Sequence, residues 1–148
     1  MLTDVLTQIF DRDLDKLKAE VEAYVDENDL WLLSGDISNS AGNLTLHLIG
    51  NLKHFFGAVL GETGFVRERD LEFSSDGVPR EDLVAGIDEA ANVVRKTLAG
   101  LSVDDLASEY PTNVFGGPMT TEFFIVHLAT HLNYHLGQVN YHRRLLAS

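Results

Sequence analysis

Four long segments of this chain repeat apolar residues at steps of three and four, which is the spacing of one face of an α-helix. They cover about residues 2–27, 40–60, 79–100 and 120–146. No segment shows the convincing apolar–polar alternation of a strand. Because amphipathic helices bury their apolar faces against one another, the pattern predicts an all-α fold, a four-helix bundle. At 148 residues, the chain is expected to form a single domain over 1–148.

The connections between these segments contain turn-forming residues and short apolar groups. Residues 31–33 are Trp-Leu-Leu, and we expect them to cover one end of the core. Residues 62–78 form a connection that is long for a bundle and could join helices that are not neighbours. Residues 102–105, Ser-Val-Asp-Asp, resemble a capping box, so one short helical turn is predicted there.

The balance of charge is strongly acidic, with 11 Lys and Arg against 23 Asp and Glu, a formal net charge of −12. Nucleic-acid binding draws most of its affinity from Lys and Arg on phosphates, so this charge argues against it. The same reasoning argues against an anionic membrane surface. No apolar run approaches the roughly 20 residues of a membrane span, and residues 1–10 do not resemble a signal peptide. A cytoplasmic location is therefore expected.

The chain has no cysteine, so any transition metal must be bound by His, Asp or Glu. Four of the six histidines lie in the fourth segment, where a helix places them within about 80° of arc. Gln138 falls in the same stripe. The stripe consists of His127, His131, His135 and His142.

The second segment has a similar polar stripe beside its apolar arc, formed by Asn43, His47, Asn51 and His54. Two inward-leaning stripes on two helices of one bundle can face each other. His131 and His135 lie one turn apart and could bind one ion, with His47 as the candidate third ligand. Three imidazoles leave at least one position open for water or substrate, as in catalytic zinc sites, and also suit nickel, cobalt, copper and iron.

Simpler interpretations exist for single histidines, which at a core edge are usually hydrogen-bonded and structural. His142 lies in the last turn of its helix, where a cation interacts favourably with the helix dipole. His54 is expected at the rim of the bundle. No glutamate follows His131, so the His-Glu-x-x-His signature of metalloproteases is absent.

Three stretches together resemble the DinB/YfiT-like superfamily of metal-dependent proteins. Residues 126–138 (VHLATHLNYHLGQ) are similar to its last helix, residues 44–52 (LTLHLIGNL) to its second helix, and residues 67–73 (RERDLEF) to an acidic connector of one subfamily. The resemblance implies a four-helix bundle with a long second connection. It also implies a divalent ion, zinc or nickel, on His47, His131 and His135. Leu136 stands where the superfamily often has arginine.

The superfamily implies two further properties. Its members are commonly homodimers. Characterised relatives include transferases and isomerases that use a low-molecular-weight thiol such as bacillithiol or mycothiol. The first hypothesis is therefore a metal-dependent thiol transferase acting on a small-molecule substrate, with His127 as its acid or base because imidazole titrates near neutrality. Asn43, Asn51 and Gln138 flank the three ligands and could orient them or contact substrate.

Two alternatives stay open. The first is a metal-assisted hydrolase, in which a bound water is activated and the general base is His127, Asp70 or Glu72. The second is a non-enzymatic domain, in which the ion only steadies the fold or an oligomer. A fourth coordination position filled by the protein, for example by His127, would favour this alternative.

Overall fold

The structure is a computed structural model that describes residues 1–148, and all of its regular elements are helices, as predicted. In chain order they are α1 (Leu2–Ala23), η1 (Glu27–Trp31), α2 (Ala41–Leu52), η2 (Lys53–Leu60), α3 (Arg69–Ser74), α4 (Arg80–Ala99), α5 (Val103–Ala107) and α6 (Thr121–Leu146). The one β-type contact is an isolated bridge between Glu109 and Thr120, which joins the two ends of the loop before α6.

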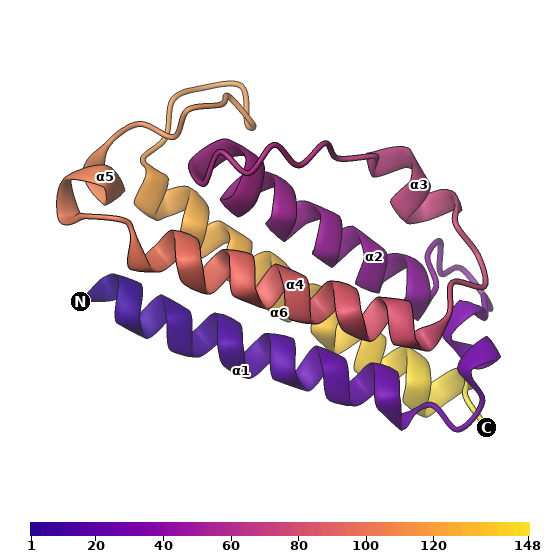
Figure 1. Cartoon of the computed structure of the whole chain (residues 1–148). Helices are drawn as coiled ribbons and strands as arrows, with labels where there is room; N and C mark the ends of the chain where they lie inside the picture. The colour runs from indigo at the N-terminus through magenta and orange to yellow at the C-terminus, as the bar shows by residue number, and fades with distance from the viewer.

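The long helices α1, α2, α4 and α6 lie side by side (Figure 1). The helix α1 packs against α4 and α6, and α2 packs against the same two helices. The short helix α3 lies on α2, and η2 continues α2 towards α4. The second connection, over residues 62–78, runs along α2 before the chain enters α4 (Figure 1).

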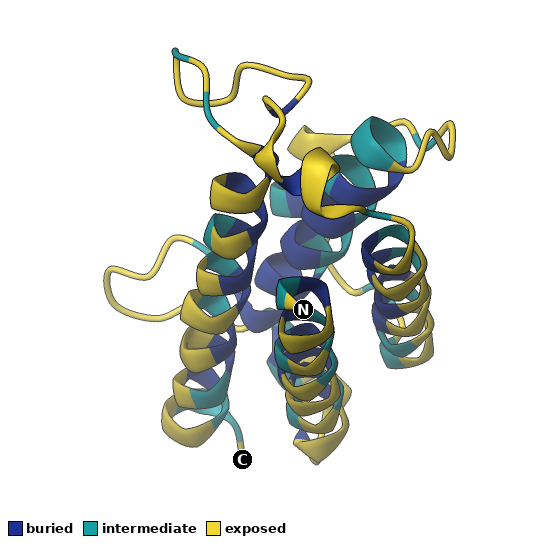
Figure 2. Cartoon of the chain, turned by 90° about the vertical axis from the view of Figure 1, so that its left-hand side faces the viewer, coloured by how far each residue is buried: buried dark blue, intermediate teal, exposed yellow.

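The apolar faces of these helices form one continuous core, and the outward faces are exposed (Figure 2). Within it Phe10 of α1 meets Phe56 of η2 edge to face, with ring centroids 5.2 Å apart. Such aromatic pairs add about 0.5–1.5 kcal/mol to the burial of their area. The spacing of apolar residues in the sequence thus corresponds to the buried faces of the helices.

Three helix starts follow the capping rules. The hydroxyls of Ser40 and Thr120 accept hydrogen bonds from the backbone N–H groups of Asn43 and Phe123, which begins α2 and α6. The capping box predicted at Ser102 is present and begins α5. A side-chain acceptor satisfies backbone donors that would otherwise be unpaired in the first turn, so these boundaries agree with the sequence.

The first predicted helix is shorter than expected, because α1 ends at Ala23 and the chain then turns into η1. In this turn Leu30 is fully buried and Trp31 packs on Gly42, where a Cβ would lie 2.6 Å from the indole ring. Leu32 and Leu33 are 39% and 60% exposed. The prediction that all of residues 31–33 cover the core was therefore wrong for the two leucines.

The second predicted helix changes its hydrogen-bond pattern at Lys53, where α2 passes into the π-helix η2. Two carbonyl groups in η2 accept hydrogen bonds from outside the helix. The hydroxyl of Tyr110 donates to the carbonyl of Phe55 at 2.7 Å, and that of Thr97 donates to the carbonyl of Phe56 at 3.3 Å. Partners of this kind help to satisfy a segment whose own bonds depart from the α pattern.

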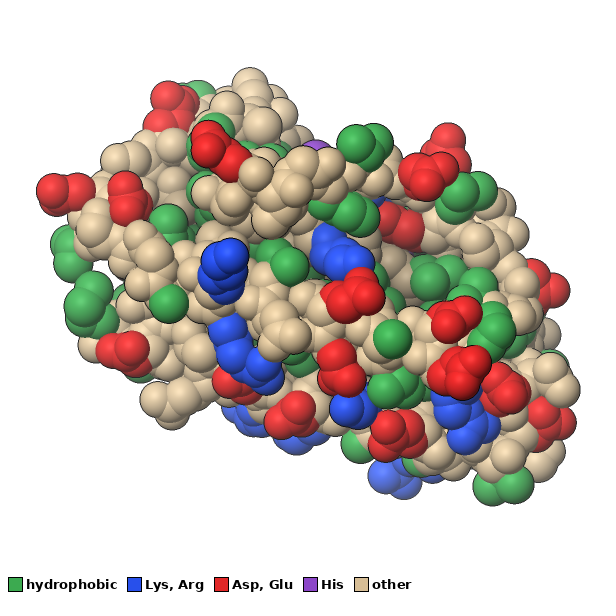
Figure 3. All heavy atoms as spheres, in the orientation of Figure 1, with side chains coloured by type: hydrophobic (Ala, Val, Ile, Leu, Met, Phe, Trp, Pro, Cys, Tyr) green, Lys and Arg blue, Asp and Glu red, His purple; other side chains and the backbone are tan.

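Acidic and basic side chains are interspersed over the face formed by α1 and α4, where almost no histidine surface is visible (Figure 3). Ion pairs join the two helices here, from Lys18 to Asp88 at 3.1 Å and from Arg95 to Asp11 at 2.6 Å. Exposed pairs of this kind are typically worth less than about 1 kcal/mol. None of the helices is both long enough and apolar enough to cross a bilayer.

Candidate metal centre

Three histidines from two helices converge at the interface of α2 and α6. His47 of α2 is buried, while His131 and His135 of α6 are partly buried. One ring nitrogen from each lies within 4.8 Å of the other two, and the Nε2 atoms of His47 and His131 are 3.1 Å apart. The structure therefore brings together the three residues proposed as ligands.

His47 is held from behind by a carboxylate of the connector. Its Nδ1 lies 3.1 Å from Oε1 of Glu72, a buried residue of α3. A carboxylate only accepts hydrogen bonds, so Nδ1–H donates and Nε2 keeps its lone pair for a ligand role. Arg67 binds both oxygens of Glu72, each at 2.8 Å. Burial acts to raise the pKa of Glu72, but the hydrogen bonds from His47 and Arg67 hold that pKa below its ordinary value.

The other two rings differ in their support. His135 Nδ1 lies 2.7 Å from the side-chain oxygen of Gln138, which assigns the proton to Nδ1 and leaves Nε2 free. His131 Nδ1 is buried without a hydrogen-bond partner. Burial, followed by the neighbouring histidines, lowers the pKa of His131 to about 3, and burial also lowers the pKa of His135. Both rings are therefore neutral near pH 7, the form in which imidazole binds a metal.

The geometry fits a transition-metal ion. Two nitrogens bound to one tetrahedral ion at about 2.0–2.1 Å lie about 3.3 Å apart. The separation of 3.1 Å between His47 Nε2 and His131 Nε2 is close to that value. A carboxylate behind one histidine is the usual outer support of zinc-bound imidazole. A donor set of imidazole nitrogens suits zinc, copper, iron or nickel.

Aromatic side chains surround one side of the cluster. His127, the candidate acid or base, stacks on Phe124 with centroids 5.8 Å apart and meets the exposed Phe115 at 4.9 Å. Its ring centroid is 6.2 Å from that of His131, and it is not among the three converging histidines. His127 thus lies beside the cluster without joining it.

The remaining candidates take different positions around the cluster. Asn43 is buried and donates to the carbonyls of Glu72 and Ser75, so its amide fixes the connector to α2. Asn51 is also buried, and its side-chain oxygen has no partner. Leu136 is buried beside α1, at a groove between α1 and α6 that the three histidines do not line.

Sequence reasoning named Glu72 only as a possible general base and did not identify Arg67 as its partner. Both residues lie in the stretch that resembles an acidic connector, but the spacing of residues 67 and 72 gives no indication of which helix they contact. The structure adds that α3, a helix absent from the prediction, presents Glu72 to His47.

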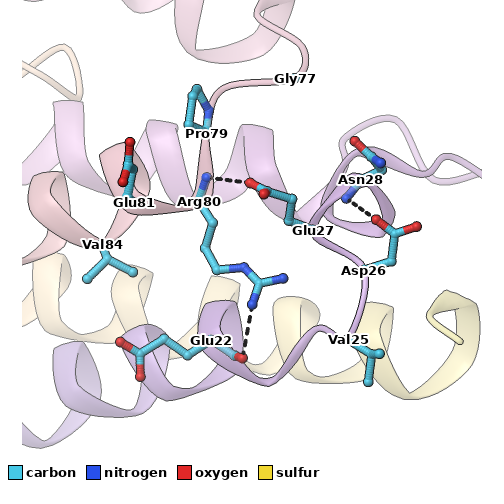
Figure 4. Close-up of a pocket in the computed structure, with 10 residues that line it drawn as sticks. All are labelled: Glu22, Val25, Asp26, Glu27, Asn28, Gly77, Pro79, Arg80, Glu81 and Val84. Atoms are coloured by element: carbon cyan, nitrogen blue, oxygen red, sulfur yellow. Dashed lines mark hydrogen bonds between the residues drawn. The ribbon is translucent and has the colours of Figure 1, made fainter.

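A separate hollow on the surface lies between the end of α1, η1 and the start of α4 (Figure 4). No histidine lines it, although four carboxylates do: Glu22, Asp26, Glu27 and Glu81. Arg80 spans it, donating to the backbone carbonyls of Tyr24 and Glu22, while its own N–H donates to Glu27. These bonds tie three elements together, which accounts for Arg80 structurally.

Comparison with known proteins adds a family to this geometry. A search of the curated proteins gave no match. A family model described as a protein of unknown function, DUF1572, matches residues 4–148. That match includes all four long helices, the connector and the three converging histidines. The chain therefore belongs to the DUF1572 family.

Proposed function

We propose that this protein binds one divalent ion, zinc or nickel, through His47, His131 and His135. The observation that supports it best is the convergence of three imidazoles, two of which have their far nitrogen occupied by Glu72 and Gln138. Support of this kind orients a ring so that its other nitrogen faces the ion. The proposal includes the fold type, a single-domain four-helix bundle of the DinB/YfiT-like kind.

Metal content tests this proposal directly. Protein purified without chelators should contain about one equivalent of zinc or nickel per chain by elemental analysis. After the metal is removed with a chelator, titration with either ion should restore the same stoichiometry. A chain that takes up neither ion at micromolar concentration would overturn the proposal.

The proposed activity is transfer of a low-molecular-weight thiol to a small electrophilic substrate. A divalent ion held by His47, His131 and His135 would keep a thiol ligand in its thiolate form near neutral pH. The sulfur then forms a bond to the electrophilic carbon as the leaving group departs with the bonding electrons. His127 is the proposed acceptor of the thiol proton, and the exposed ring of Phe115 beside it suits an apolar part of the substrate.

Three observations bear on the choice between the thiol transferase, the hydrolase and the non-enzymatic domain. Glu72 has both oxygens engaged by Arg67 and His47, which disfavours it as the base of a hydrolase. His127 stands outside the cluster, so a fourth position filled by that residue is not favoured. Leu136 lines a groove between α1 and α6 that contains none of the three histidines, so the lack of an arginine at this position does not count against the proposed site.

An assay with thiols separates the three functions. Metal-loaded protein incubated with bacillithiol, mycothiol or glutathione and a chromogenic electrophile should give a rate above that of metal-free protein. Cleavage of an activated ester without any thiol would instead indicate a hydrolase. Equal rates with and without metal for every thiol and ester would leave the non-enzymatic role.

We also propose that the protein forms a homodimer through α6. One side of this helix is exposed and mostly uncharged within about 100° of arc, with Arg144 at one edge as its charged residue. Its uncharged residues are Phe123, Val126, Thr130, Tyr134, Gly137, Tyr141 and Leu145. Because the net charge of −12 makes two copies repel elsewhere, a face without acidic side chains is the favourable one for their contact.

Light scattering on purified protein tests the dimer. The wild type should have twice the mass of one chain, and Tyr134→Glu should reduce it to one. The matched control is Ala85→Glu, which adds the same charge at an exposed position of α4. A wild type that stays monomeric at high micromolar concentration would contradict the proposal.

A further inference from the structure

Glu72 reaches His47 from a segment that no long helix contains. It lies on α3, in the middle of the connector between η2 and α4, yet only 7% of its surface is exposed. Burying a carboxylate is costly unless it is paired and hydrogen-bonded. Its three hydrogen bonds, two from Arg67 and one from His47, meet that requirement.

Gly50 of α2 makes room for this carboxylate. A Cβ at that position would lie 1.9 Å from Oε2 and 2.7 Å from Cδ of Glu72, separations that atoms cannot adopt. Glycine inside a helix costs about 1 kcal/mol relative to alanine. The helix therefore tolerates an unfavourable residue one turn from His47, at the place where Glu72 enters.

Two further contacts fix the connector to the same face of α2. Asn43 donates from its amide to the carbonyls of Glu72 and Ser75, at 3.0 and 2.8 Å. Phe73 packs on the ring of His47, with centroids 4.9 Å apart. The connector thus contacts His47 directly with three of its side chains, Arg67, Glu72 and Phe73.

We propose that docking of the connector on α2 and binding of the ion are one coupled equilibrium, with Glu72 as the positioning residue. This inference rests on the proposed metal site. The docked connector holds His47 with its proton on Nδ1 and its Nε2 towards the ion. Coupling between two binding events is reciprocal, so the bound ion must stabilise the docked connector by the same factor.

Zinc affinity, measured by competition with a chromogenic chelator, tests the first direction. Glu72→Gln should bind zinc about 10–100-fold more weakly, as is typical when the group behind a metal-bound histidine is altered. Gly50→Ala should weaken binding in the same direction, although it touches no ligand. Glu68→Gln is the matched control, since Glu68 is exposed on the same connector and its side chain forms no cap. It should bind as the wild type does.

A spectroscopic signature distinguishes positioning from a general loss of fold. With cobalt in place of zinc, the visible absorption bands should shift in Glu72→Gln and stay unchanged in Glu68→Gln. Circular dichroism of the metal-free variants shows whether each one folds. If Glu72→Gln does not fold, the proteolysis of the wild-type protein with and without zinc decides.

Proteolysis of the wild type tests the second direction. Trypsin can cut the connector after Arg67 and Arg69, and zinc should slow both cuts by about tenfold or more. Cleavage after the exposed Arg144 serves as an internal control and should change little. Unchanged cleavage at Arg67 and Arg69, or a folded Glu72→Gln with wild-type affinity, would overturn this inference while the metal site stands. A wild type that binds no metal would overturn both.

Discussion

Two histidines of α6 lie on the same stripe and have opposite surroundings. At the C-terminal end of the helix, His142 is 7% exposed and both of its ring nitrogens have partners within the protein. Its Nδ1 lies 2.6 Å from the hydroxyl of Tyr24 and its Nε2 lies 2.9 Å from the carbonyl of Leu32. In the middle of the helix, His131 has a buried Nδ1 without a partner and an Nε2 that faces another histidine.

This comparison shows why spacing along a helix does not separate a ligand from a structural histidine. The proton on Nε2 of His142 is donated to Leu32, so Nδ1 accepts from Tyr24 and the ring is fully used. The interaction with the helix dipole, by which His142 was explained from the sequence, is therefore not needed to account for this histidine. The Nδ1 of His131 has no partner in the protein and its Nε2 meets only the Nε2 of His47, as expected of a residue that binds something else.

The largest expected effect comes from His131→Ala. Because it removes one of the three proposed ligands, zinc binding should weaken at least about a hundredfold, more than for a supporting residue. His142→Ala should keep wild-type affinity. Calorimetric titration of both variants measures the difference. Equal losses of zinc affinity in the two variants would contradict the assignment of His131 as a ligand and His142 as a structural residue.

The next effect is on the stability of the fold, and here the important residue is His142. His142→Ala leaves the carbonyl of Leu32 unpaired, leaves the hydroxyl of Tyr24 with only its 3.5 Å bond to the carbonyl of Val139, and creates a cavity. The free energy of unfolding should therefore fall by about 2–3 kcal/mol. Tyr24→Phe keeps the ring and removes only the donor, and should cost about 1–2 kcal/mol. Urea unfolding of metal-free protein measures both. A neutral His142→Ala would show that these hydrogen bonds contribute little.

The smallest effect concerns the link between α1 and the C-terminal end of α6. Glu20 accepts from Arg143 at 2.7 Å and also from Asn140. Burial acts to raise the pKa of Glu20, but these hydrogen bonds outweigh it and hold that pKa below its ordinary value of 4.5. A carboxyl with a lowered pKa stabilises the fold above its unfolded pKa, and this contribution is lost as pH falls through the folded value.

Glu20→Gln should therefore lower the free energy of unfolding by about 1 kcal/mol at pH 7. The difference from the wild type should shrink as pH falls below about 4.5, where the unfolded carboxyl takes up its proton. Urea unfolding at several pH values gives the measurement. A difference that is constant with pH would show that the charge of Glu20 is not the source of the stability.

Much of the fold could be predicted because helical spacing and caps are local properties. The starts of α2, α5 and α6 follow from Ser40, Ser102 and Thr120, each of which satisfies a backbone donor within its own turn. The π-helix η2 could not be predicted, since the hydroxyls that bond its carbonyls come from Thr97 and Tyr110, far along the chain. The helix α3 was not predicted for a different reason, because six residues are too few to show a repeat of apolar positions.

The candidate site divides in the same way. His131 and His135 are one turn apart and could be paired from spacing alone, and the family resemblance added His47. The support behind His47 could not be predicted, because Glu72 reaches it across a connector whose path depends on contacts with α2. Gly50, a glycine in the interior of a predicted helix, was a sequence signal of close approach.

The close contact between Gly50 and Glu72 also predicts how these two positions vary among members of the family. Since no side chain at position 50 can coexist with the carboxylate in its present place, the two residues should be kept or lost together. Relatives with alanine or a larger residue at position 50 should have exchanged the glutamate at position 72 or shifted the connector. This pair of positions would then divide DUF1572 into subgroups whose histidine sites are supported in different ways.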